Sequence, residues 1–175
     1  MTQRAYSRGT ALPIVLLMSS MLLVTAAASF EMALVRARAT AQSSDRVQAF
    51  HSADSALNRC ARVAIESMRE QQTASDPLAG EPARWRLRAS FEGASADAIV
   101  PFASWPHAAR PPQCLIEAWP TLVQGQAGAF LITARGFGRT AGSEVWLQQQ
   151  IKIVEGHMVR HWRRVVARPF QGTSP

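Results

Sequence analysis

The sequence predicts an α+β fold in which one long N-terminal helix packs on an antiparallel β-sheet. Three observations lead to this fold class: a charge-free run near the start, a helical pattern that continues beyond it, and alternating patterns in the C-terminal half. The 175 residues suit one domain with an anchor. We expect a leader over 1–9, a transmembrane helix over 10–30, its amphipathic continuation over 31–72, a β-sheet domain over 73–170 and a disordered tail over 171–175.

The apolar run extends from Ala11 to Phe30 without a charge and has about the 20 residues that a helix needs to span a bilayer. Arg4 and Arg8 precede it and, by the positive-inside rule, place that end in the cytoplasm. A single-pass or secreted protein with its mass outside the cytoplasm is therefore expected. The residues expected to contact lipid or other apolar helices are Ala11, Pro13, Ile14, Leu16, Leu17, Met18, Leu22, Leu23 and Phe30.

Two interpretations of this N-terminus compete. A secretory signal peptide would be cut after Ala28 and release a soluble periplasmic binding protein. Alternatively, the cut follows Gly9 and the helix is retained. Pro13 favours the second, because a proline inside a continuous helix costs about 3 kcal/mol. In a chain that begins at Thr10 it lies in the first turn, where its missing N–H has no partner in any case.

The helical pattern continues from 31 to 72, where the sequence contains neither glycine nor proline. Apolar residues recur there at three-, four- and seven-residue steps, which predicts an amphipathic helix that packs on the sheet. Ser43, Ser44 and Asp45 mark either a kink or a cap between two helices. The residues expected to pack against the sheet are Val47, Phe50, Leu57, Ala61 and Met68.

The C-terminal half alternates as strands do. We expect Trp85, Leu87, Ala89 and Phe91 to share one face of a first strand, and Phe102 and Trp105 to anchor the proline-rich loop that follows. Further strands are expected over 114–119, over 129–138 and 144–154 as a hairpin, and over 159–166.

Cys60 and Cys114 are the two cysteines of the chain. In a domain outside the cytoplasm a disulfide between them is the default expectation, and it would add about 4 kcal/mol by the chain-entropy estimate. Two buried free thiols are the alternative.

The chain carries a net charge of +7, which predicts an arginine-coated, solvated surface. We expect no enzymatic activity, cofactor or metal site, since the sequence has no nucleophile motif, P-loop or dinucleotide fingerprint. His157 and His161 flank a predicted strand, where their spacing gives no ready chelate. The run from His161 to Arg164 places Trp162 among basic groups, as in single-strand DNA binders, but we expect tryptophans here to serve packing, so nucleic acid is not an expected partner.

The chain resembles type IV prepilins, specifically minor pilins of the PilX type. Arg8-Gly9 precedes the apolar helix, and the segment 45–57 is similar to the family's R-x-x-A-F-x-A-A-E-x-A-L stretch, with Asp54 in place of the glutamate. The segments 130–138 and 145–148 also resemble the family's last hairpin. The resemblance implies a pilin-like fold, cleavage after Gly9 by prepilin peptidase and N-methylation of Thr10.

The resemblance further implies a bacterial inner-membrane protein with a single span and a periplasmic domain, whose helix moves from the membrane into the core of a pilus. The implied partners are other minor pilins, the major pilin and a large tip adhesin; a pseudopilin of type II secretion is the alternative within this architecture. Ile14 departs from the family, which has a glutamate there that neutralises the buried N-terminal amine of a neighbouring subunit. A tip or initiation position, where no such neighbour exists, would remove the need for it.

Overall fold

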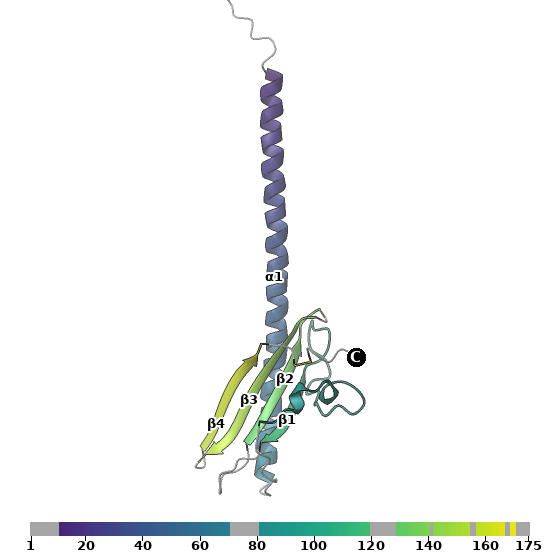
Figure 1. Ribbon diagram of the computed structural model, residues 1–175, viewed down its shortest axis with the longest axis vertical. Coiled ribbons are helices and arrows are strands. Elements are labelled where there is room, and N and C mark those ends of the chain that lie inside the picture. The colour runs from purple at the N-terminus through teal and green to yellow at the C-terminus, as the bar shows by residue number, and fades with distance from the viewer. Residues whose placement is uncertain are drawn as a thin grey trace, which may run out of the picture. The chain divides into compact units, whose positions relative to one another are not determined.

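The computed structural model describes residues 11–70, 81–119, 129–140, 142–154, 157–166 and 169–170. The chain divides into two compact units, Met1–Ser43 and Ser44–Pro175. Helix α1 (Ala11–Glu70) contributes to both, and the second unit adds the 3-10 helices η1 (Arg84–Arg86) and η2 (Arg88–Ser90). The strands are β1 (Gln113–Trp119), β2 (Ala129–Phe137), β3 (Glu144–Val154) and β4 (His157–Val165) (Figure 1). One long N-terminal helix and an antiparallel sheet, the predicted α+β layout, are thus confirmed.

The sheet is an antiparallel meander in the order β1-β2-β3-β4. Its four strands correspond to the strands predicted over 114–119, 129–138, 144–154 and 159–166, with bounds that differ by at most two residues. Successive side chains of a strand point to opposite faces, so each strand supplies residues to two different layers. Leu147 and Trp146 of β3 illustrate this, because they belong to the two separate cores described next.

The core between α1 and the sheet is built from small side chains on the helix. Because alanine adds little thickness, the helix backbone approaches the strands closely. A Cβ added at Gly136 of β2 would lie under 3.0 Å from backbone atoms of Ala49 and Ala53. The buried members of this core are Ala49, Ala53, Ala56, Leu57, Cys60, Ala61 and Ala64 of α1, with Cys114, Ile132, Ala134, Val145, Leu147 and Ile151 of the sheet.

The expected packing stripe is partly wrong. Leu57 and Ala61 are buried and Phe50 is half-buried against this core, but Val47 is 52% exposed. The buried face follows the alanines, and Val47 lies two residues, about 200° of helix rotation, before Ala49. The close approach at Gly136 selects the face with the shortest side chains. The side chain of Met68 lies outside the described residues.

Of the two expectations for Ser43–Asp45, the cap between two helices is wrong, because α1 continues through these residues. Asp45 instead accepts hydrogen bonds from the Arg139 N–H and from Thr140 Oγ1, the latter at 2.7 Å. A polar residue that resembles a helix cap in sequence therefore fastens the β2–β3 connection to the helix.

The opposite face of the sheet is covered by the segment that contains η1 and η2. Trp85 and Phe91 are buried there with Leu115, Leu131 and Trp146. The predicted strand over 85–91 is wrong: the segment forms two 3-10 turns, which expose Leu87 and Ala89.

The reason is that the backbone of this segment finds other partners than a strand ladder. The N–H groups of Arg84 and Trp85 donate to the Glu117 carboxylate of β1, at 2.9 and 3.3 Å. The N–H groups of Leu87 and Phe91 donate to carbonyls three residues earlier, at Arg84 and Arg88. Trp85, in the middle of η1, and Phe91, directly after η2, reach the core from short turns, which the alternating pattern does not distinguish from a strand.

The segment over 93–112 is irregular, as expected, apart from a single bridge between Ile99 and Cys114. Phe102 and Trp105 contact each other, with ring centroids 5.3 Å apart, and are half-buried, but they belong to neither core. The Gln48 side chain on α1 donates to the Pro106 carbonyl at 2.6 Å. The predicted anchors therefore pack within the loop, and a polar contact ties the loop to the helix.

Candidate functional site

The first candidate site is the apolar surface of α1 in the first unit. Its large apolar side chains are each at least 48% exposed. A soluble monomer rarely exposes a contiguous apolar surface of this extent, and such surfaces are typical of contacts with lipid or with other proteins. The exposed side chains include most of the predicted membrane or filament contacts: Leu12, Ile14, Val15, Leu16, Leu17, Met18, Met21, Leu22, Leu23, Val24, Phe30, Met32, Leu34 and Val35.

The few polar side chains of this segment bond to the helix itself. Ser20 Oγ donates to the Leu17 carbonyl at 2.8 Å, and Ser29 Oγ donates to the Thr25 carbonyl at 2.8 Å. Thr25 Oγ1 donates in the same way to the Met21 carbonyl at 3.0 Å. Such bonds satisfy a hydroxyl without water, as an apolar environment requires. By length and composition α1 is able to cross a membrane, although a signal sequence near an N-terminus has the same properties.

The residues that the resemblance assigns to processing, Gly9 and Thr10, lie outside the described residues. Ile14 lies in α1, with 54% of its side chain exposed. No residue of α1 from Ala11 to Phe30 carries a charge, and Glu31 is the first carboxylate. The apolar segment therefore contains no carboxylate.

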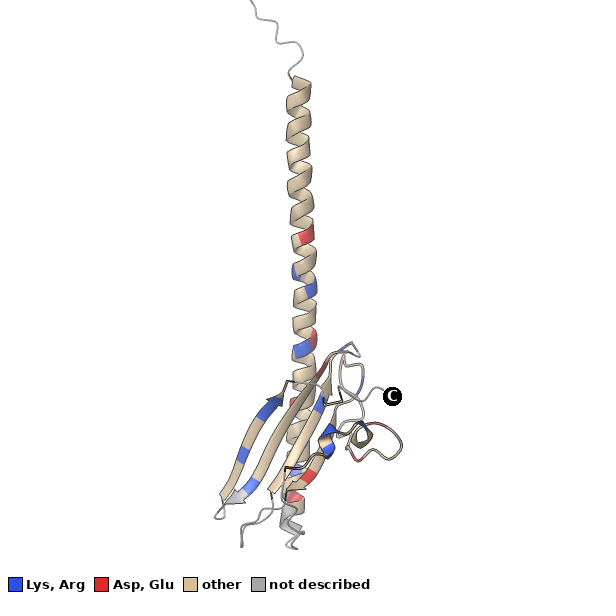
Figure 2. Ribbon diagram, viewed as in Figure 1, with Lys and Arg blue, Asp and Glu red and all other residues tan. Residues whose placement is uncertain are grey.

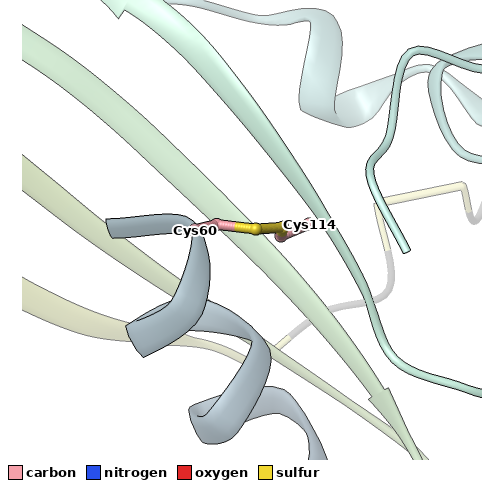
Figure 3. Close-up of a disulfide and its surroundings, with 2 residues drawn as sticks. All are labelled: Cys60 and Cys114. Carbon is pink, nitrogen blue, oxygen red and sulfur yellow. A yellow bond between two sulfur atoms is a disulfide. The ribbon is translucent and has the colours of Figure 1, made fainter. Parts of the chain in front are cut away.

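A disulfide joins Cys60 of α1 to Cys114 of β1 (Figure 3). Both cysteines are buried, and they are separated by 54 positions in the sequence. The sequence analysis left free thiols as an alternative, and the structure contains the expected bond. The helix that carries the apolar surface is thus covalently fastened to one edge of the sheet.

Buried charges hold the rest of the second unit together. The Thr140 hydroxyl and the Arg139 N–H lower the pKa of the Asp45 carboxylate. Arg135, 7% exposed at its side chain, pairs with Glu144 at 2.8 Å and with Glu92 at 2.7 Å, and this bond from Arg135 lowers the pKa of Glu92. Burial raises the pKa of the Glu117 carboxyl, although two backbone N–H groups oppose the shift.

We predicted no role for Arg135, Glu92 or Glu117, and we expected Asp45 to mark a kink or a cap of the helix. Their partners lie far away in sequence; Asp45 and Thr140, for example, are 95 positions apart. No local pattern identifies such a pair. Each of these charged groups bonds to neighbours within the domain, and these bonds stabilise the fold.

Two cavities are lined by described residues of the second unit. One of about 170 Å³ is lined by Trp119, Leu131, Gln148, Gln150, His161, Trp162 and Arg163. The other, of about 320 Å³, lies beside Arg46, Val145 and Arg164. Within the described residues no three His, Cys, Asp or Glu side chains come together as a metal site. His157 and His161 both lie on β4, four residues or about 13 Å apart along the strand, which is too far for a shared ion.

No family model, no curated protein and no solved structure matches this chain.

Proposed function

We propose that the chain is a minor pilin that takes part in the initiation or tip assembly of a type IV pilus. One observation supports this most strongly: the exposed apolar residues and the buried alanine face belong to one uninterrupted helix, Ala11–Glu70. Such a helix holds the protein in the inner membrane before assembly and then inserts among the apolar helices of a filament. The domain that is built on its second half presents a folded surface to other pilins and to a tip adhesin.

The exposed side chains also favour retention of the helix over a signal peptide that ends at Ala28. Large apolar residues continue beyond that point: Phe30 is 72% exposed, Met32 56% and Val35 64%. A soluble protein that begins at Ser29 would carry all three on a single helical end in water. Their burial among other helices removes this cost of apolar exposure.

The mass of the mature N-terminus tests the proposal. When the chain is expressed with prepilin peptidase, we expect the loss of residues 1–9 and a methyl group on Thr10; without the peptidase we expect the full chain. Gly9→Val should abolish the processing, because a branched side chain replaces the glycine that precedes the cleaved bond. Ala28→Val is the matched control and should be processed normally. A mature chain that begins at Ser29 would overturn the pilin proposal.

The tip position follows from Ile14 and has its own test. In Ile14→Glu the new carboxylate supplies the partner that a buried N-terminal amine requires, so the subunit becomes able to follow another one in the shaft. Immunogold labelling of pili is expected to shift from the ends to positions along the shaft. Ile14→Gln, similar in size and uncharged, should remain at the ends. Labelling that stays terminal in Ile14→Glu would argue against this explanation of Ile14.

A further inference from the structure

Strand β4 is an open edge of the sheet. It pairs with β3 on one side, and no described residue pairs with its other side (Figure 1). The opposite edge is different, because Ile99 and Cys114 of β1 exchange hydrogen bonds of 2.7 and 2.8 Å there. The backbone N–H and C=O groups along the outer side of β4 are therefore available to another strand.

The side chains of β4 are exposed on both faces of the sheet. On the helix side, Met158 is 41% and Trp162 50% exposed, although Trp162 packs edge-on against Phe50 with ring centroids 6.3 Å apart. Charged side chains such as the arginines of β4 commonly protect an edge strand from pairing with a like strand, whereas exposed apolar side chains on an edge favour pairing. An indole that is fixed on one side and exposed on the other is a suitable anchor for a partner.

The charged residues of this edge strand are all basic. Between His157 and Val165 there are three arginines and no acidic residue, and the basic positions are visible along β4 in Figure 2. Arg163 pairs with Glu81, whereas the Arg160 guanidinium donates hydrogen bonds to Met158 Sδ, at 3.4 Å. Within the described part of the chain neither Arg160 nor Arg164 makes an ion pair. Two positive charges on the helix side thus have no acidic partner among the described residues.

This charge also selects the partner. A second copy that paired through its own β4 would bring the three arginines of each strand together without an acidic residue, and like charges across neighbouring strands are destabilising. Single-stranded nucleic acid is commonly held by several stacked aromatic side chains, whereas β4 offers one tryptophan whose ring already packs against Phe50. An extended polypeptide with acidic side chains matches both the unpaired backbone and the charge.

We propose that β4 binds an extended acidic segment of another protein, which adds to the sheet as a further strand. Backbone hydrogen bonds supply affinity, and carboxylates opposite Arg160 and Arg164 select the segment. An apolar side chain of the partner packs on Trp162. The inference rests on the proposed function in one respect, that assembly supplies such a partner; the surface itself belongs to the unit Ser44–Pro175.

The test uses the full chain in nanodiscs of neutral phosphatidylcholine and fluorescein-labelled peptides, with binding measured by anisotropy. The probe is an eight-residue peptide of alternating glutamate and valine. The comparison peptides carry lysine in place of glutamate, or two central prolines that prevent strand pairing. We expect binding of the probe, no binding of either comparison peptide, and weaker binding at high salt.

Two double variants with reversed charges test whether β4 is the surface that binds the peptide. The double variant Arg160→Glu with Arg164→Glu should bind the probe peptide about tenfold or more weakly, because two favourable cross-strand pairs are lost. The same variant should bind the lysine peptide. Arg59→Glu with Arg62→Glu, on the exposed side of α1, changes the net charge equally and should leave binding unchanged. Circular dichroism and thermal unfolding of each variant establish that it is folded.

Equal binding of the probe and its proline-containing form would overturn strand addition, because charge alone would then suffice. Binding of oligothymidylate in place of the peptide would overturn the choice of partner. A failure of peptide binding in a chain that is processed after Gly9 rejects this inference alone. A mature N-terminus at Ser29 together with normal peptide binding rejects the pilus proposal alone.

Discussion

Gly136→Ala is expected to lower the midpoint of thermal unfolding of the full chain by about 10 °C or more. The added methyl group would lie under 3.0 Å from backbone atoms of Ala49 and Ala53, and these cannot rotate away as a side chain can. The helix must move from the sheet, and this loosens the whole alanine-lined core. Overpacking of this kind costs about 3 kcal/mol, which corresponds to about 10 °C for a domain of this size.

Thermal unfolding in detergent micelles, followed by circular dichroism, measures the effect. Gly142→Ala is the matched control, since a Cβ there has no atom within 4 Å, and it should unfold within about 2 °C of the wild type. If Gly136→Ala unfolds at the same temperature as Gly142→Ala, helix and sheet are not in close backbone contact. If Gly136→Ala folds poorly while Gly142→Ala folds normally, the clash at Gly136 destabilises the protein by more than the predicted amount.

The fold class and the four strands could be predicted because their signals are local. Alternation and turn residues mark β1 to β4, and the absence of glycine and proline marks the second half of α1. The face of that helix could not be predicted from hydrophobicity, because contact with Gly136 selects Ala49 and Ala53 over the larger Val47. Side-chain size at the partner surface decided the face.

The turns at η1 and η2 and the role of Asp45 depend on partners that are distant in sequence. Glu117 bonds to the backbone of Arg84 and Trp85, and Asp45 bonds to Arg139 and Thr140. Only the folded chain brings these groups together, so no local pattern reports them.

The candidate site divides in the same way. The apolar segment of α1 follows from composition alone, because a long charge-free run has few alternatives in a folded protein. The open backbone edge of β4 follows from strand order, which the sequence does not state: the same nine residues between two other strands would be paired on both sides. The strand becomes a candidate docking edge only through its position in the sheet.

Loss of the disulfide is the second large effect. Cys60 and Cys114 close a loop of 54 positions, and the chain-entropy estimate gives about 4 kcal/mol of stability for a loop of this length. Because the bond joins α1 to β1, the unfolded chain without it gains freedom between its helix and its sheet. Cys60→Ala with Cys114→Ala should therefore lower the free energy of unfolding by about this amount, increased slightly by two small cavities.

Urea unfolding of the full chain with and without a reductant measures the entropic contribution of the disulfide to the free energy of unfolding. The reductant should shift the wild-type midpoint to lower urea and should leave the double alanine variant unchanged, since that variant has no bond to lose. The two conditions compare one wild-type sequence, so the cavity contribution is absent from the wild-type shift. Alkylation of both thiols shows that the reductant has opened the disulfide. If the urea midpoint of the wild type is nevertheless unchanged, the prediction is contradicted. In that case the alanine-lined contact between α1 and the sheet persists in the unfolded chain strongly enough to replace the covalent link.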